Sequence, residues 1–228
     1  MQIDELMELV KNRRSIRKFR PETIPDEYIQ KILETARWAM SGANGQPWEF
    51  LIIKDNDTKK KLAEAFLHYH GMQMKIEMTR MPEYRHRTAV TQEGTTPFWE
   101  QAPVVIAVLG DMRTMLISTI IQRLYEQHTF DQNMANVTQM IHLAAYSLGL
   151  GTQWLSLDPP RSEAVKQILG IPPEIRLFNL VPIGYPAYQK TGNRRNLAEM
   201  VHYEKYDISK MRTDDAILEF VKNSRKTP

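Results

Sequence analysis

Apolar residues recur at three- and four-residue intervals in several stretches of the chain, which is the spacing of an amphipathic helix. In the first stretch Ile3, Leu6, Met7 and Val10 fall on one face. The predicted helices cover residues 3–10, 25–40, 57–66, 112–126, 131–148, 161–169 and 215–221. Pro25, followed by two acidic residues, is typical of a first helical turn, and glycines at 149 and 151 end the longest helix.

Apolar runs without helical spacing predict strands. Residues 104–109 and 177–183 are almost continuously apolar, as in strands buried on both faces. Two further strands are predicted at 49–54 and 151–157. Strands separated by helices indicate a mixed α/β or α+β layer structure. No strand is followed by Gly-x-Gly-x-x-Gly and there is no Walker A motif, which disfavours a Rossmann or P-loop fold.

Two regions lack this regular pattern. Residues from about 70 to 100 have no sustained period and carry methionines and aromatic residues among many charges, which predicts a lid or binding loop, or alternatively a disordered link. The stretch from about 204 to 228 is mostly polar and is predicted to be a C-terminal extension that packs on a partner subunit, a disordered end being the alternative. The whole chain, 1–228, is expected to be a single domain that includes these two segments as an insertion and an extension.

Composition narrows the class of protein. A chain of 228 residues with 42% hydrophobic residues can bury a substantial core. A net charge of +3 is too small to argue for a nucleic-acid partner. Absence of cysteine excludes disulfides, thiolate metal sites and cysteine nucleophiles. No apolar stretch is long enough to span a bilayer, and the acidic residues near the N-terminus do not fit a signal peptide. We therefore expect a cytoplasmic protein with no membrane partner.

The basic segment 13–19 reads Arg-Arg-Ser-Ile-Arg-Lys-Phe. A solvated run of charge has no need of Ile16 and Phe19, whereas a segment anchored to a core while presenting guanidinium groups does. Planar arginine donors suit phosphate, and Ser15 adds a hydroxyl donor. The segment therefore indicates a phosphate site, with a solvated patch, a nuclear localisation signal or a nucleic-acid contact as alternatives.

Two loops offer further polar groups. Residues 41–48 read Ser-Gly-Ala-Asn-Gly-Gln-Pro-Trp. Their small residues would let the backbone approach a flat ligand, and the Asn and Gln amides could form hydrogen bonds with its edge. An ordinary helix-to-strand loop is the alternative. The loop 193–196 contains a second arginine pair, which is either a phosphate contact or exposed charge. No metal site is expected, because His68 and His70 diverge on a helix, and no catalytic triad stands out.

Taken in order, these segments resemble the FMN-dependent nitroreductase family. The resemblance rests on the basic run after the first helix, the loop entering Gln-Pro-Trp and a strand, and two later motifs. These are Gly-Leu-Gly-Thr followed by Trp-Leu-Ser at 149–156, and Leu-Val-Pro-Ile-Gly-Tyr-Pro at 180–186, before the Arg194 loop. It covers nearly the whole chain outside 70–100 and 111–130.

The resemblance implies an α+β fold with a mixed, mostly antiparallel sheet flanked by helices. It also implies an intertwined homodimer with FMN at the subunit interface. The residues carried over by position as cofactor-binding are Arg13, Arg14, Ser15, Arg17, Ser41, Ala43, Asn44, Gln46, Trp154, Leu155, Ser156 and Arg194.

These residues are expected to contact different parts of FMN. Arg13, Ser15 and Arg194 would hold the phosphate, and Arg17 would approach the N1–O2 edge of the ring. The loop starting at Ser41 would line the ring or ribityl chain, from the partner subunit. Ser156 would donate towards N5.

The resemblance further implies a ping-pong oxidoreductase, in which NAD(P)H reduces FMN and a flat acceptor such as a nitroaromatic or quinone is then reduced. Acceptor contacts are predicted for Ala43, Met81, Tyr84 and Trp99. One alternative is a reductive dehalogenase of the iodotyrosine deiodinase type, although no lysine follows Lys75 before the strand at 104 to complete that branch's lid clamp. A non-catalytic FMN-binding sensor is the other.

Overall fold

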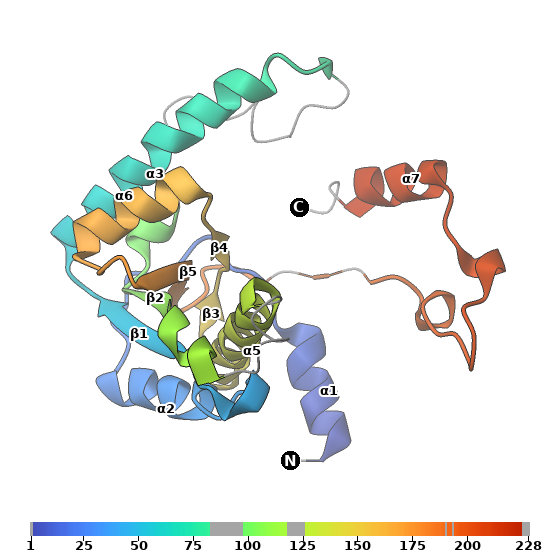
Figure 1. The fold of residues 1–228 in the computed structure, drawn as a ribbon, viewed down its shortest axis with the longest axis horizontal. Coiled ribbons are helices and arrows are strands. Elements are labelled where there is room, and N and C mark those ends of the chain that lie inside the picture. Colours follow the sequence, from blue (N-terminus) through green and yellow to red (C-terminus); the bar gives the residue numbers. More distant parts are fainter. Residues whose placement is uncertain (1, 83–97, 118–125, 190, 193, 225–228) are drawn as a thin grey trace. The chain divides into compact units, whose positions relative to one another are not determined.

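The computed structural model describes residues 2–82, 98–117, 126–189, 191–192 and 194–224. The chain forms two compact units, Met1–Tyr188 and Gln189–Pro228. In the first unit a sheet lies between two pairs of helices, α2 with α5 and α3 with α6 (Figure 1). The predicted α+β class is confirmed.

The sheet is built around three long antiparallel strands. They are β1 (Trp48–Ile53), β2 (Val104–Asp111) and β5 (Ile175–Gly184), in the order β1-β2-β5. Two short strands, β3 (Gly151–Thr152) and β4 (Leu155–Ser156), each pair antiparallel with β5. The single strand predicted at 151–157 is therefore two short strands separated by Gln153 and Trp154, and the N–H of Gln153 still donates to the carbonyl of Pro182 in β5 at 3.3 Å.

The helices of the first unit are α1 (Ile3–Asn12), α2 (Asp26–Ala36), α3 (Asn56–Glu77), α5 (Glu126–Ser147) and α6 (Pro159–Leu169). They create two hydrophobic cores, one on each face of the sheet. Even-numbered positions 104–108 of β2 pack with α2 and α5, and odd-numbered positions 105–109 pack with α3 and α6. This alternation explains why the strand is apolar at nearly every position.

Several predicted helices differ from those observed: α2 ends at Ala36 and not near 40, and α5 begins at Glu126 and not at 131. Asp55, and not Asp57, caps α3, since its carboxylate accepts the N–H of Thr58 at 2.7 Å. The same helix continues to Glu77, so the first part of the predicted lid is helical. Residues 112–117 form a 3₁₀ helix, η5 (Met112–Ile117), in place of the predicted α-helix.

The C-terminal unit begins at Gln189, earlier than the predicted extension. It contains two 3₁₀ turns, η6 (Leu197–Glu199) and η7 (Ile208–Lys210), and helix α7 (Asp214–Ser224), which confirms the helix predicted at 215–221. Many of its apolar side chains are exposed: Leu197, Met200, Tyr203, Tyr206, Ile208, Met211, Ile217 and Leu218.

The basic segment 13–19 is anchored on the sheet by its backbone. Ser15 forms a parallel bridge with Thr152 of β3, and the N–H of Ile16 donates to the carbonyl of Thr152 at 2.9 Å. Phe19 forms an antiparallel bridge with Pro186, beyond the end of β5. The segment therefore runs along the β3 edge of the sheet, and its parallel bridge makes the arrangement mixed.

A pair of glycines makes room for the two buried side chains of this segment. Gly151 of β3 pairs with Gly184 of β5. A Cβ atom on Gly151 would lie 2.6 Å from Cγ1 of Ile16, and one on Gly184 would lie 2.8 Å from Cδ1 of Phe19. Since contacts this short do not occur, any side chain at these positions would displace the basic segment.

We predict that Gly151→Ala destabilises the protein by about 1–3 kcal/mol through overpacking against Ile16. The matched control is Gly71→Ala, because a Cβ there meets nothing within 4 Å and the site lies inside α3. The control is expected to stabilise by roughly 0.5–1 kcal/mol. Urea unfolding of the ligand-free variants measures both, and equal effects of the two substitutions would contradict this packing account.

Candidate functional site

The anchored segment presents its polar side chains away from the core. Ile16 and Phe19 are 6% and 5% exposed, whereas Arg17 and Lys18 are exposed and Arg14 is half-buried. The N–H of Arg17 donates to the Tyr188 hydroxyl at 3.1 Å, which fixes the backbone beneath its guanidinium group. This arrangement agrees with a segment pinned to a core and differs from a solvated charge run.

The strands beside this segment carry the second group of predicted residues. Trp154 stacks on His142 of α5 with ring centroids 6.0 Å apart and meets Phe178 edge-on at 5.6 Å. Its Nε1 donates to Oγ of Ser156 at 3.1 Å. Leu155 points into the core and Ser156 is exposed, so these residues have different environments although they are adjacent.

His142 lies beneath both groups. Its Nδ1 is 2.6 Å from Oγ1 of Thr152, the residue that bridges to Ser15. Burial and, to a smaller extent, the positive charge of Arg13 together lower the pKa of His142 to about 4. The imidazole is thus neutral near pH 7, and the basic segment, β3 and Trp154 converge on it. We call this arrangement of residues 13–17, Thr152, His142 and 154–156 the arginine wall.

Sequence reasoning gave His142 only as an interior or polar-face residue, and the interior interpretation is confirmed by its 4% exposure. Its link to Thr152 and Trp154 was missed. Thr152 and Trp154 are ten and twelve residues further along the chain, beyond the end of α5. Nothing in the local pattern signals such a contact.

The loop that begins at Ser41 has an unusual backbone. Ala43, Asn44 and Gln46 have positive φ angles of 53°, 53° and 42°. Such conformations cost energy in residues other than glycine and cluster at ligand sites. Oγ of Ser41 accepts the N–H of Gln46 at 3.1 Å, and the Gln46 amide donates to Oδ1 of Asn44 at 3.1 Å, so the loop's polar groups brace one another.

Helix α5 holds this loop at a place distant from the arginine wall. The N–H of Gly42 donates to Oδ1 of Asn133 at 3.0 Å, and Nδ2 of Asn136 donates to the carbonyl of Met40 at 3.1 Å. Asn133 lies nine residues before His142, which is about 14 Å along the helix axis.

The other predicted site residues are dispersed. Arg194 belongs to the C-terminal unit, where its neighbour Arg195 lies 3.8 Å from Glu199. Met81 is exposed just beyond α3. Trp99 is only 1% exposed and meets Phe66 edge-on inside the core, so it offers no exposed face to an acceptor. Tyr84 lies outside the described residues.

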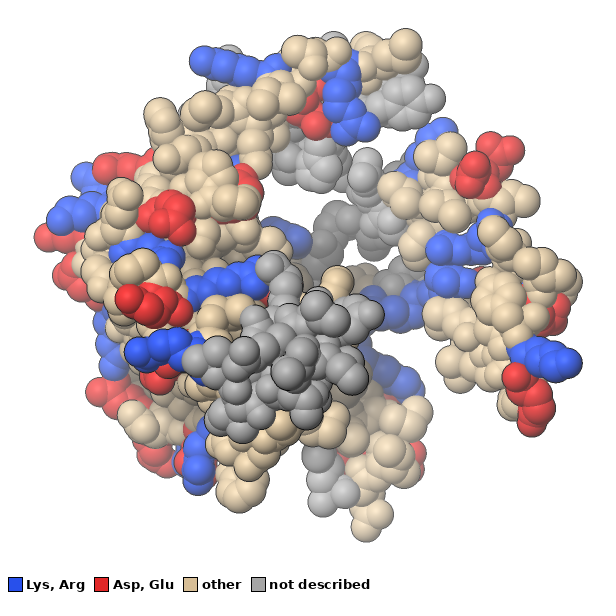
Figure 2. All heavy atoms as spheres, in the orientation of Figure 1, with Lys and Arg blue, Asp and Glu red and all other residues tan. Residues whose placement is uncertain are grey.

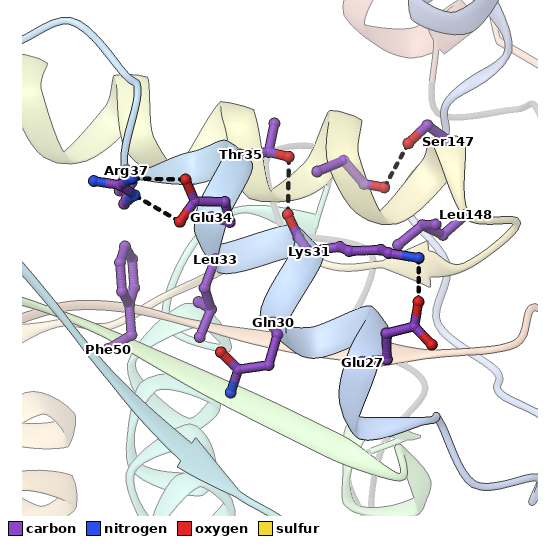
Figure 3. A pocket seen from close by; sticks show the side chains of 11 residues that line it. Glu27, Gln30, Lys31, Leu33, Glu34, Thr35, Arg37, Phe50, Ser147 and Leu148 are labelled. Carbon is purple, nitrogen blue, oxygen red and sulfur yellow. Dashed lines mark hydrogen bonds and ion pairs between the residues drawn. The ribbon is translucent and has the colours of Figure 1, made fainter.

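Two surface hollows lie elsewhere. The larger, of about 780 Å³, is bounded by α2, β1 and the end of α5 (Figure 3). Its charged groups pair with one another, Glu27 with Lys31 and Glu34 with Arg37. The second, of about 550 Å³, follows the outer side of β1. Neither contains a predicted cofactor residue.

Basic and acidic side chains are interspersed over the described surface of each unit on the face shown in Figure 2. The described residues on that face form no continuous basic surface of the kind that binds nucleic acid. Among the described residues, no helix is both long and apolar enough to cross a membrane.

Comparison with known proteins identifies the family. The model of the nitroreductase family matches residues 10–185, and the chain belongs to that family of oxidoreductases. An Archaeoglobus fulgidus protein named NADH dehydrogenase/NAD(P)H nitroreductase is 30% identical, over 90% of this chain and 100% of its own. An iodotyrosine deiodinase of Haliscomenobacter hydrossis is also 30% identical, over 80% of each chain.

A solved structure supports the same assignment. It is a nitroreductase in complex with FMN from Desulfovibrio desulfuricans, with a TM-score of 0.65 and 25% identity, covering 89% of this chain and 98% of the other. The predicted resemblance is confirmed.

Proposed function

We propose that this protein is an FMN-dependent NAD(P)H oxidoreductase in which the arginine wall of one subunit binds FMN and the Ser41 loop of a second copy completes the site. The observation that carries the proposal is the anchoring of Ser15 and Ile16 to Thr152. It brings the arginines and the Trp154–Ser156 segment onto one edge of the sheet. The FMN-bound relative and the relatives named NAD(P)H nitroreductase support it.

The wall fits the phosphate of FMN. Nε of Arg14 is buried and has no hydrogen-bond partner among the described residues. No ion pair of the described residues includes Arg14 or Arg17, and the pairs on either side along the chain join Lys11 to Glu8 and Arg20 to Glu22. Nη1 of Arg14 donates to the carbonyl of Arg13 at 2.7 Å, so Nε is the buried donor of Arg14 that is left for a ligand. A guanidinium donor beside a hydroxyl is well matched to a phosphate dianion. Arg13, Arg14 and Ser15 would hold that group, with Arg194 as a further predicted contact.

The other end of the wall fits a flavin ring. The hydroxyl of Ser156 accepts a hydrogen bond from Trp154, so its own proton remains available to donate. Ser156 is exposed and would donate towards the ring N5. Arg17, exposed on the same segment, would place its positive charge at the N1–O2 edge and stabilise negative charge that develops there. The chemistry that FMN supplies when bound is hydride transfer from NAD(P)H and onward reduction of a flat acceptor.

Exposed apolar surface supports a second copy at the site. Helix α1 has no buried residue, and its Ile3 is 67% exposed. Trp38 and Met40, which directly precede the Ser41 loop, are 73% and 80% exposed. Ile3, Leu6, Met7 and Val10 share one face of α1 and are all exposed, and contiguous apolar surface of this kind marks protein–protein interfaces. A homodimer that buries it would bring the loop of one chain to the wall of the other.

Purification and anaerobic reduction test the proposed function. We expect a yellow protein whose flavin absorbance is bleached by NADH or NADPH and is restored by an acceptor. A screen of nitroaromatics, quinones and halogenated phenols separates a nitroreductase or quinone reductase from a dehalogenase. Bound flavin that neither nucleotide bleaches would favour a sensor. A protein that binds no added FMN would refute the proposal.

The ring contact is tested by Arg17→Ala. Loss of the guanidinium group is expected to weaken FMN binding by roughly 10–100-fold, because hydrogen bonds to charged groups contribute about 1.5–3 kcal/mol. It should also lower the reduction potential of the bound flavin. Lys18→Ala, at the adjacent exposed cation, is the matched control and should change neither quantity. Unchanged FMN affinity and potential in Arg17→Ala would refute this role.

Mixed dimers test the shared site. Arg17→Glu damages the wall, and Asn44→Asp damages the loop while keeping a residue that tolerates positive φ. Each pure variant should lose FMN. In mixed dimers isolated with two affinity tags, one site carries both changes and the other neither, so FMN content should return to about half of the wild-type value. No recovery would show that each site is built within one chain.

A further inference from the structure

The arginine wall has two halves that share a single buried side chain. One half is the basic segment, which reaches the sheet through the Ser15–Thr152 bridge and the 2.9 Å hydrogen bond from Ile16 to Thr152. The other is Trp154, whose Nε1 holds the Ser156 hydroxyl at 3.1 Å. Both Thr152 and Trp154 contact the imidazole of His142.

The contact with Thr152 is well placed to control the position of the basic segment. Thr152 is 2% exposed and His142 is 4% exposed, so the hydroxyl and the imidazole are each other's partners in a part of the core that solvent does not reach. A buried hydroxyl without its partner is costly, and the strand would shift to satisfy it. The backbone of Thr152 carries the bridge to Ser15, so such a shift would move Ser15 and the adjacent arginines.

The contact with Trp154 acts on the opposite half. The imidazole is nearly parallel to the indole, at an interplanar angle of 26°, and Phe178 packs against the indole in a T-shaped arrangement. The two rings therefore fix the plane of the indole, and with it the direction of Nε1 towards Ser156. Removing the imidazole would free the indole to tilt and release the Ser156 hydroxyl.

The protonation state of His142 is suited to both contacts. Burial and the charge of Arg13 hold its pKa at about 4, so the ring is neutral at ordinary pH. A neutral imidazole keeps one donor and one acceptor nitrogen, and it adds no positive charge beside the arginines.

We propose that His142 is a positioning residue that sets the phosphate half of the wall through Thr152 and the ring half through Trp154. The inference rests on the proposed FMN site and deepens it. His142 itself lies beneath the wall, and its effect on the ligand is exerted through Ser15 on one side and Ser156 on the other.

Two substitutions separate the two contacts. His142→Phe keeps an aromatic ring against Trp154 and removes the polar atom facing Thr152. His142→Asn keeps a polar atom close to the place of Nδ1 and removes the ring. Thr152→Val removes the same hydrogen bond from the other side. His68→Phe and His68→Asn, at an exposed histidine of α3, are the matched controls.

The readouts are the dissociation constants of FMN and riboflavin, measured by flavin fluorescence on the ligand-free protein, together with its urea unfolding. His142→Phe and Thr152→Val should each weaken FMN by roughly three- to tenfold, as expected for one lost hydrogen bond, and leave riboflavin unchanged. The double variant His142→Phe/Thr152→Val should be no weaker than either single variant, because both remove one interaction. His142→Asn should weaken FMN and riboflavin equally. The His68 variants should change nothing.

The possible failures are distinguishable. If the wild-type protein binds neither flavin, the proposed function is wrong. A second outcome is that the wild type binds FMN, but every His142 variant weakens the binding of FMN and of riboflavin by the same factor and only in proportion to its loss of unfolding stability. His142 then has a general structural role, and the inference is overturned. Additive effects of His142→Phe and Thr152→Val would also overturn it.

Discussion

The bridge between Ser15 and Thr152 is the constraint on which the rest of the site depends. It brings a basic segment that follows the first helix to a strand more than a hundred residues later in the chain. Two glycines that face each other across β3 and β5 leave the space that Ile16 and Phe19 fill. The burial of these two side chains holds the arginines at a fixed place, because the segment's apolar positions and its polar positions face opposite ways.

The site therefore has two parts, the arginine wall and the Ser41 loop, which are held in different ways. The wall stands on the sheet: Ser15 is held by backbone pairing with Thr152, the backbone of Arg17 by the Tyr188 hydroxyl, and Trp154 by ring packing. The Ser41 loop has three non-glycine residues at positive φ, and it is held by side-chain hydrogen bonds within itself and to Asn133 and Asn136 of α5. A strained loop directly after the exposed Trp38 and Met40 is best explained if a second subunit uses it, since the strain is then part of a shaped ligand site.

The sequence allowed the main elements to be predicted because their patterns are local. The continuous apolar run of β2 reflects two cores, and the helical stripe of α5 reflects one. The predictions that were wrong concern elements whose extent depends on contacts between residues far apart in the sequence. Helix α3 runs past Gly71 to Glu77, where Gln73 hydrogen-bonds with Asp158 and Arg161 lies 4.5 Å over the Phe66 ring, and both partners come from the start of α6. No pattern near residue 71 reports contacts with residues almost ninety positions later.

The same reasoning applies to the site. The arginine segment was recognisable because its apolar residues interrupt its charge, and the burial of Ile16 and Phe19 has a local signature. The role of Trp99 was not predictable in this way, since an aromatic residue beside a polar stretch reads equally as a lid residue or as core, and it packs against Phe66. His142 had no distinguishing mark until the fold placed Thr152 and Trp154 on it.

A crystal structure of the protein with FMN tests the central claim most directly. The account predicts the phosphate within hydrogen-bonding distance of Ser15 and an arginine of the 13–17 segment of one chain. It also predicts the flavin ring against Ser156 of that chain and the Ser41 loop of the other. An FMN molecule bound in the hollow beside Leu33 and Phe50, or held by one chain alone, would contradict it.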